Sequence, residues 1–163
     1  MERPLAGATV ILEFKSGFPH TRYRSGRPRV NRKSLPDELQ LAADLICEFA
    51  AGRAVARAQI ARLLPATPPF HAACWRAALT IPAGETRTYQ WLAAAAGRPR
   101  AHRAAAAAMA RNPLAPLVPC HRVVSATGLG GFCGTMAQPG DRTPAHWALG
   151  MKLRLLENER TRR

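Results

Sequence analysis

Several features that define other protein classes are missing from this chain of 163 residues. Its longest runs without a polar residue, such as residues 104–110, are far shorter than the roughly 18 apolar residues that a membrane span requires. The sequence also lacks collagen or coiled-coil repeats, and its start lacks the cationic segment, apolar core and cleavage site of a signal peptide. We therefore expect one or two small globular domains that stay in the cytoplasm and have no membrane partner.

The four cysteines do not follow the patterns of a disulfide scaffold or a zinc site. None of them forms a CxxC pair, and the chain is not a short secreted domain of the kind that disulfides stabilise. The five histidines never fall at zinc-finger spacing from the cysteines. We expect neither a disulfide framework nor a structural zinc ion.

Acidic residues are absent between Glu85 and Asp141, although the chain as a whole contains 10 of them against 24 Lys and Arg, for a net charge of +14. A solvated basic surface is one explanation. The alternative is a nucleic-acid partner. The positive charges of a segment without acidic residues repel one another unless a polyanion neutralises them, and the arginine side chain suits forked contacts to phosphate. The arginines in this block are Arg87, Arg98, Arg100, Arg103, Arg111 and Arg122.

Residues 1–66 are expected to form a small first domain with a short β-sheet. The segment 8–14 (ATVILEF) predicts a strand, and the stretch 16–34, rich in Arg, Ser, Gly and Pro, predicts a basic loop or hairpin. Ser34 and the acidic residues that follow it predict the start of a helix, whose apolar stripe ends at Gly52. This domain offers few polar residues that could carry out chemistry.

A proline-rich linker, LPATPP at residues 64–69, leads into the second expected domain, residues 67–163. Capping and helix-stop residues predict three helices, over residues 70–79, 89–96 and about 101–111. The last two, joined by a short turn, have the outline of a helix-turn-helix. Arg100, Arg103 and Arg111 fall within roughly 80° of each other at about 100° per residue, so one side of the last helix is cationic.

The segment 112–124 (NPLAPLVPCHRVV) carries the strongest indication of chemistry. Cys120 stands beside His121 and Arg122, after apolar residues and a proline that fixes the backbone, which is a setting that can stabilise a thiolate. A thiolate is a competent nucleophile, whereas a thiol is not. Spacing alone leaves a second interpretation open, a buried cysteine beside a surface histidine.

Several blocks of the second domain resemble one protein family. Asn112-Pro113, PCHRVV at residues 119–124 and GLGGF at residues 128–132 are similar to the signature of the methylated-DNA–protein-cysteine methyltransferases, the O6-alkylguanine-DNA alkyltransferases. The resemblance covers more than half of the chain, whereas residues 1–66 resemble the family's variable first domain only loosely. The other matching blocks are TPPFHAACW from residue 67, IPAGETRTY at 81–89 and KLRLLENE at 152–159.

The resemblance implies a mixed α/β fold with a mostly helical second domain, and a repair reaction. Members of the family transfer an alkyl group from the O6 atom of guanine in DNA to their own cysteine, once per molecule. By position, Cys120 is the acceptor, His121 deprotonates it through a bound water, and Glu159 orients His121 and stabilises its charge. No metal or cofactor is required. Because a stretch at about 134–147 is inserted relative to compact members, Glu157 is the alternative to Glu159.

The resemblance also assigns residues that handle DNA. Tyr89 matches a tyrosine that hydrogen-bonds the base and donates a proton to it. Arg103 matches the family's arginine finger, a side chain that fills the space left in the base stack when the nucleotide rotates out of the duplex. Asn112 matches the residue that ties the recognition helix to the active-site loop, and the small residues 104–107 would let that helix enter the minor groove. A structural role is the alternative for each. Three further arginines are expected to contact phosphates: Arg98, Arg100 and Arg111.

Two positions depart from the family pattern. Phe132 stands, one residue early, where the family usually has a tyrosine, and Cys133 follows where a small residue is usual. Cys133 is expected to be either an apolar filler of a glycine-rich loop or a second thiol close enough to Cys120 for an oxidised pair.

Three functions remain open from the sequence. The first is a monomeric, single-turnover alkyltransferase that acts on double-stranded DNA containing O6-alkylguanine. The second is a non-catalytic sensor of alkylated bases with the same fold, and the third is a helix-turn-helix transcription regulator. Cys120 favours the first, because the sensors lack the acceptor cysteine and a regulator does not explain the PCHRVV block.

Overall fold

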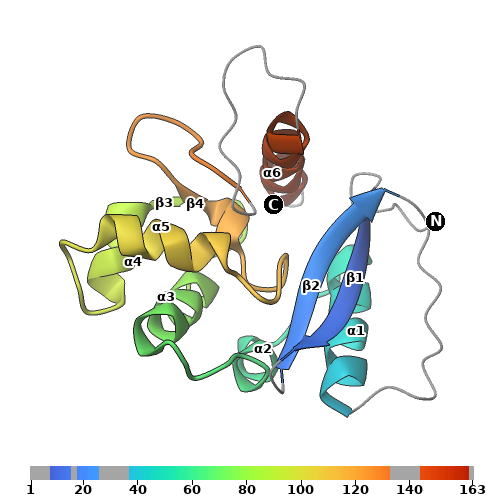
Figure 1. The fold of residues 1–163 in the computed structure, drawn as a ribbon. Coiled ribbons are helices and arrows are strands. Elements are labelled where there is room, and N and C mark those ends of the chain that lie inside the picture. Colours follow the sequence, from blue (N-terminus) through green and yellow to red (C-terminus); the bar gives the residue numbers. More distant parts are fainter. Residues whose placement is uncertain (1–7, 16–17, 26–36, 133–143, 162–163) are drawn as a thin grey trace. The chain divides into compact units, whose positions relative to one another are not determined.

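The structure of the chain is a computed structural model that describes most of the sequence. The described residues are 8–15, 18–25, 37–132 and 144–161. They fall into two compact units, and Figure 1 shows the elements of each. The first unit contains the described residues up to Pro65 together with Pro113–Leu117, and the second contains Ala66–Asn112 and the residues from Val118 onward.

The first unit is a β-hairpin with two helices. Strands β1 (Ala8–Lys15) and β2 (Phe18–Ser25) pair antiparallel along their whole length, and α1 (Asp37–Ala50) packs against both. Strand β1 covers the segment 8–14 that was expected to be a strand, and α1 lies where a helix was expected. Gly52 follows α1 with a φ of +76°, a conformation that glycine adopts easily. The short helix α2 (Arg57–Arg62) was not expected, because Ile60 is its one buried residue and gives no periodic stripe.

The second unit is built around three short helices that pack against one another, α3 (Pro69–Leu79), α4 (Tyr89–Ala95) and α5 (His102–Ala110) (Figure 1). All three predicted helices are confirmed to within one or two residues. The sequence signals act as expected: the Thr88 side chain accepts a hydrogen bond from the Trp91 amide at 3.1 Å, and Gly97 follows α4 with a φ of +82°.

The alanines of α5 are divided between the core and the surface. Ala105 and Ala108 are fully buried, and the carbonyl of Ala108 accepts a hydrogen bond of 2.8 Å from the Trp75 indole of α3. Ala104 and Ala110 are exposed. Part of the alanine run therefore lets two helices approach each other, which is the structural explanation of these residues.

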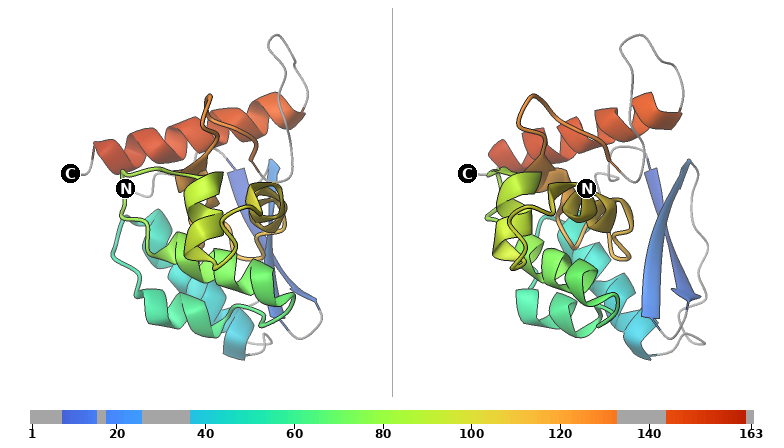
Figure 2. Two further views of the ribbon diagram at one scale, coloured as in Figure 1. Left: turned by 90° about the vertical axis from the view of Figure 1, so that its left-hand side faces the viewer. Right: turned by 60° about the vertical axis from the view of Figure 1, so that its left-hand side comes forward.

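A two-stranded parallel sheet, a 3-10 turn and a long helix complete the second unit. Strand β3 (Arg87–Thr88) pairs with β4 (Val123–Val124), and the turn η2 (Cys120–Arg122) leads directly into β4. Helix α6 (Pro144–Arg160) packs against η2, and Figure 2 shows it from two further sides. The chain thus has the mixed, mostly helical fold that was predicted, and no described helix is long and apolar enough to cross a membrane.

The start of α6 corrects the extent of the expected insertion. The stretch at about 134–147 was expected to precede the C-terminal helix, but residues 144–147 already belong to α6. A proline is well tolerated in the first turn of a helix, so Pro144 marks its beginning. The remainder of the stretch, together with Cys133 and Ser34, lies outside the described residues.

Candidate active site

Cys120 is the first residue of the η2 turn and is only 4% exposed. Burial raises the pKa of its thiol, while a hydrogen bond with the Asn112 side chain and the positive charge of Lys152 act in the opposite direction. The net shift is upward, so the resting group is a thiol. A base must therefore remove the proton before this sulfur can act as a nucleophile, and the side chains of Asn112 and Lys152 favour the thiolate once it forms.

His121 is fully buried beside Cys120 and is bound to Glu159 of α6. The His121 Nε2 and Glu159 Oε1 atoms are 2.8 Å apart. Burial lowers the pKa of His121 more than the Glu159 carboxylate raises it, so the imidazole is neutral at neutral pH. Nε2 must then donate to the carboxylate, which leaves the lone pair on Nδ1, an atom without a hydrogen-bond partner among the described residues. This arrangement presents a buried proton acceptor.

Glu159 is held in place by three residues from two segments, the η2 turn and the turn that precedes β3. Besides His121, the Arg122 guanidinium donates from Nη2 to Oε1 at 2.7 Å and from Nε to Oε2 at 3.0 Å. The Gly84 amide donates to Oε2 at 2.9 Å. Burial on its own would raise the pKa of Glu159, but the hydrogen bonds from His121 and Arg122 lower it to about 2. The structure therefore brings an ionised Glu159 to His121, while Glu157 is exposed.

Tyr89, the first residue of α4, reaches the loop that follows β4. Its hydroxyl donates to the carbonyl of Gly131 at an Oη–O distance of 3.4 Å. Burial and the neighbouring Cys120 raise the pKa of Tyr89 to about 12, so the phenol keeps its proton at neutral pH. Gly130, at a φ of +68°, makes this approach possible, because a Cβ there would lie 3.1 Å from the Tyr89 ring and 3.2 Å from the Ser125 amide.

Asn112 connects the end of α5 with the segment that carries the thiol. Its Nδ2 donates to the carbonyl of Val118 at 2.8 Å, and its side chain also hydrogen-bonds Cys120. The structure therefore brings together all of the predicted residues of the thiol cluster. They are Cys120, His121, Glu159, Tyr89 and Asn112.

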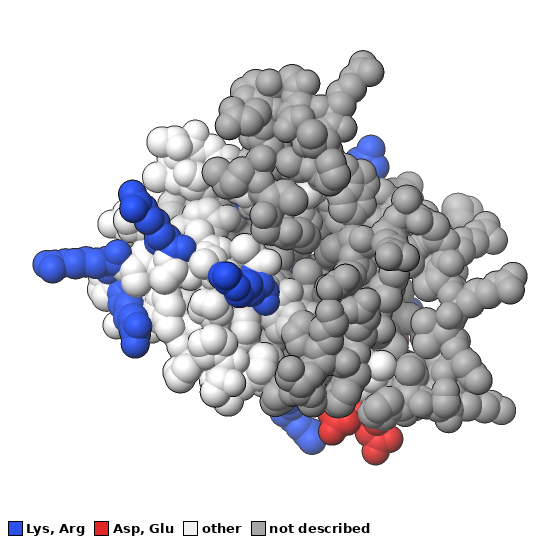
Figure 3. All heavy atoms as spheres, in the orientation of Figure 1, with Lys and Arg blue, Asp and Glu red and all other residues white. Residues whose placement is uncertain are grey.

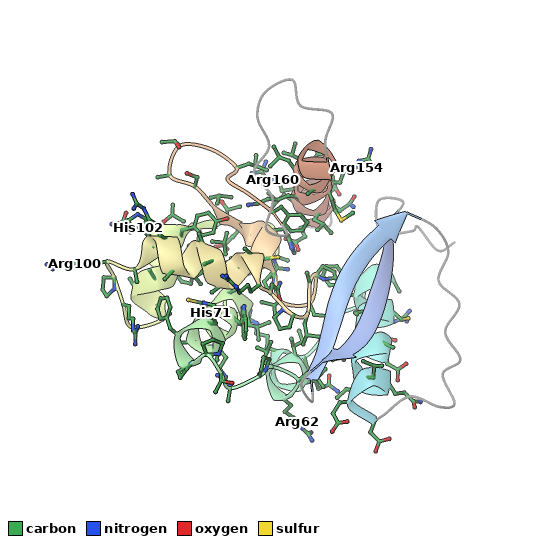
Figure 4. The ribbon with its side chains drawn as sticks, viewed as in Figure 1. Arg62, His71, Arg100, His102, Arg154 and Arg160 are labelled. Atoms are coloured by element: carbon green, nitrogen blue, oxygen red, sulfur yellow. The ribbon has the colours of Figure 1, made fainter. Side chains whose placement is uncertain are left out.

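The predicted DNA-contacting arginines lie on or next to α5 and are all exposed: Arg98, Arg100, Arg103 and Arg111. The space-filling view in Figure 3 shows basic and no acidic side chains where α4 and α5 lie, among the described residues visible from this side. In Figure 4, Arg100 and His102 project outward at the start of α5. Arg87 and Arg122, from the same basic block, instead bind the carboxylates of Glu85 and Glu159.

Comparison with known proteins identifies the family. Residues 69–161 match the family model described as 6-O-methylguanine DNA methyltransferase, DNA binding domain. The chain belongs to this family. The chain is similar to the methylated-DNA–protein-cysteine methyltransferases of Mycobacterium leprae and Methanosarcina barkeri. The first is 45% identical over 92 residues, 56% of this chain and 48% of that protein, and the second is 46% identical over 67 residues, 41% and 42% of the two chains.

The matched region spans less than half the length of these two relatives. A solved structure of Mycobacterium tuberculosis OGT in complex with DNA superposes with a TM-score of 0.61 at 29% identity, covering 94% of this chain and 87% of that one. The Mycobacterium tuberculosis O6-methylguanine methyltransferase gives a TM-score of 0.58 at 28% identity, covering 96% and 94%. These likenesses extend over both units of the fold.

Three residues of the site were missed by reasoning from the sequence: Gly84, Arg122 and Lys152. The sequence places Arg122 in the basic block and next to the thiol but does not indicate its contact with Glu159, and the amide of Gly84 has no signal in a sequence. Lys152 is seven positions, about two helical turns, ahead of Glu159, and residues at that spacing share one face of a helix. That spacing was the available signal. Among the described residues, no cluster of His, Cys, Asp and Glu is suited to a metal ion.

Proposed function

We propose that the chain repairs double-stranded DNA by transferring an alkyl group from O6-alkylguanine to Cys120, once per molecule. One observation carries this proposal. A buried cysteine adjoins a buried histidine whose Nε2 is bound to an ionised carboxylate and whose Nδ1 has no partner in the described part of the chain. This is the arrangement of an activated nucleophile.

The proposed reaction begins with the proton of the Cys120 thiol. His121 Nδ1 accepts it, directly or through a water, and the imidazolium that forms is stabilised by Glu159. The thiolate attacks the alkyl carbon in line with the bond to O6; a carbon–sulfur bond forms and the carbon–oxygen bond breaks. The thioether has no leaving group that water can displace readily, so the protein is consumed in the reaction.

Departure of guanine requires charge stabilisation, since the bond electrons go to the base. Tyr89 is suited to donate a proton to it, because its pKa of about 12 keeps the hydroxyl protonated at neutral pH. The second amide hydrogen of Asn112 is suited to stabilise the thiolate, since the first is used on Val118. Together these contacts disperse the negative charge on both sides of the reacting carbon.

We further propose that α4 and α5 form a helix-turn-helix whose second helix enters the minor groove. The support is the exposed Ala104 beside Arg103, together with the row of exposed arginines on the same side. Small side chains permit close approach to DNA, and Arg103 would fill the stack after the alkylated nucleotide rotates out. The solved complex of Mycobacterium tuberculosis OGT with DNA is consistent with this surface role.

The test compares two cysteine variants on a duplex that carries O6-methylguanine with a labelled methyl group. Cys120→Ser is expected to bind this duplex but to take up no label, because its hydroxyl is a far weaker nucleophile than a thiolate. Cys47→Ser, which alters an exposed cysteine of α1, should take up label as the wild type does.

Three results would reject the proposal. Undiminished labelling of Cys120→Ser would show that another residue accepts the methyl group. Binding without labelling in the wild type would instead indicate a sensor of alkylated bases. Binding that does not depend on the alkyl group, again without labelling, would indicate a transcription regulator.

A further inference from the structure

Lys152 of α6 is the largest fully buried side chain of the described residues, with an exposure of 0%. The choice of residue is notable in this chain, which has 21 arginines and only three lysines, Lys15, Lys33 and Lys152. A buried ammonium loses its hydration, so the fold must provide other acceptors for its hydrogens. The position of Lys152 therefore calls for a specific explanation.

Three backbone carbonyls receive the hydrogens of Lys152. Its Nζ donates to the carbonyls of Val123 at 2.6 Å, Leu129 at 2.6 Å and Gly131 at 3.1 Å. Three acceptors require three donated hydrogens, which only the charged ammonium possesses. A guanidinium spreads its donors over a plane, whereas an ammonium places three on one atom, so lysine suits carbonyls that converge on a point.

The segment held by Lys152 begins directly after the turn that carries the thiol. Val123 follows η2 directly, and Gly131 supplies the carbonyl that accepts the hydrogen bond of the Tyr89 hydroxyl. Lys152 and Tyr89 therefore share one acceptor. Any displacement of Gly131 moves the atom that orients the proposed proton donor.

The charge of Lys152 also acts on the reacting sulfur. It lowers the pKa of Cys120 against the effect of burial, and it lowers the pKa of His121. The other titratable groups around this sulfur are Tyr89 from α4 and His121 from η2, and His121 is bound to the Glu159–Arg122 ion pair. Lys152 is the group among these whose charge favours the thiolate directly, and a buried site screens that charge weakly.

We propose that Lys152 is a positioning residue for alkyl transfer, whose ammonium fixes the segment 123–131 and stabilises the thiolate of Cys120 as it forms. This proposal rests on the transfer reaction proposed above. Lys152 acts through the loop and through its charge rather than by contact with the base.

The test measures the reactivity of Cys120 without DNA. Iodoacetamide alkylation is followed against pH by mass spectrometry of the tryptic peptide 112–122, in which Cys120 is the only cysteine. Lys152→Met, which keeps the length of the side chain and removes the charge, should move the alkylation midpoint upward by about one pH unit and slow methyl transfer about tenfold. Arg154→Met is the matched control, because it removes one charge from an exposed site of α6 that projects outward in Figure 4.

A measurement on the unaltered lysine keeps the test valid if Lys152→Met does not fold. With only three lysines in the chain, the Nζ resonance of Lys152 can be assigned by nitrogen NMR. It should shift over the pH range in which Cys120 becomes reactive, and this shift should vanish in Cys120→Ser. A resonance that behaves identically in both proteins would overturn the proposal.

Failure of this proposal differs from failure of the transfer reaction. An unchanged alkylation midpoint in folded Lys152→Met overturns the role of Lys152 even when the wild type transfers methyl groups. A wild type that transfers none overturns the proposed function, and the alkylation and NMR measurements still report whether Lys152 and Cys120 are coupled.

Discussion

The protonation state of His121 depends on its burial and on neighbouring charges of both signs. Glu159 bonds to the imidazole and raises its pKa, whereas burial, Arg122 and Lys152 lower it. Arg122 binds both carboxylate oxygens of Glu159, so the carboxylate orients the imidazole without holding it permanently protonated. A neutral imidazole is what a general base requires before the reaction begins.

Arg122→Gln is expected to slow alkyl transfer most strongly at low pH. Without the guanidinium, Glu159 stabilises the imidazolium, the pKa of His121 rises, and the base becomes available only at higher pH. Single-turnover transfer rates measured against pH should show the acidic limb of the profile displaced to higher pH. At pH values below that limb the transfer rate should be about tenfold lower than in the wild type. Arg76→Gln, an exposed substitution on α3, should leave the profile unchanged. Identical profiles for Arg122→Gln and wild type would contradict this role.

Matching residues to a motif located the thiol cluster but not its supports. Cys120 and His121 are adjacent in a recognisable block, and Glu159, Tyr89 and Asn112 followed by position. Arg122 and Lys152 act through carbonyls and carboxylates of segments far away in the chain, and that convergence is a property of the fold. Apart from the seven-residue spacing of Lys152 and Glu159, the sequence gives no signal of this convergence.

Among the elements, those with their own local signals were predictable. Thr88 and Gly97 bracket α4, and the helix follows from them. The strands β3 and β4 have two residues each and no alternation to detect, so their parallel pairing depends on packing. That pairing matters for the site, because it places the start of α4, with Tyr89, next to the segment that follows Cys120.

At the scale of α5, Arg103 is expected to serve extrusion of the nucleotide while Arg100 contacts phosphate. Arg103→Ala should slow repair of duplex DNA much more than transfer from the free base O6-methylguanine, which needs no rotation out of a stack. Arg100→Ala should mainly weaken duplex binding and reduce the salt slope by about one unit. Transfer rates on both substrates, with binding measured at several salt concentrations, separate the two roles. Equal losses for Arg103→Ala on duplex and free base would rule out extrusion.

For the whole molecule, the buried His121–Glu159 pair predicts a loss of stability in acid. The pKa of Glu159 falls from 4.5 to about 2 on folding, so its contribution is complete above pH 4.5 and disappears as the pH falls toward 2. Burial also lowers the pKa of His121 below its ordinary value of 6.5. As the pH falls below 6.5, the unfolded chain binds this proton more readily than the folded one, so stability falls here too. Unfolding therefore takes up protons.

Denaturant unfolding at a series of pH values measures this effect. The wild type should lose on the order of 3 kcal/mol from Glu159 across that range, since each pKa unit corresponds to about 1.4 kcal/mol. Glu159→Gln should lack this part of the pH dependence. Glu48→Gln, which alters an exposed ion pair with Arg53, should retain it. The same dependence in Glu159→Gln and wild type would show that the pair does not control acid stability.

Whether Cys120 accepts one alkyl group and keeps it is tested most directly by counting. Wild-type protein is incubated with an excess of duplex containing O6-methylguanine, and the methyl groups per chain are measured over time by intact mass and peptide mapping. We predict a plateau at a single methyl group, located in the peptide 112–122 and unchanged by more DNA or longer incubation. Continued removal of methyl groups beyond one per chain, or a methyl group on any other peptide, would contradict transfer to Cys120.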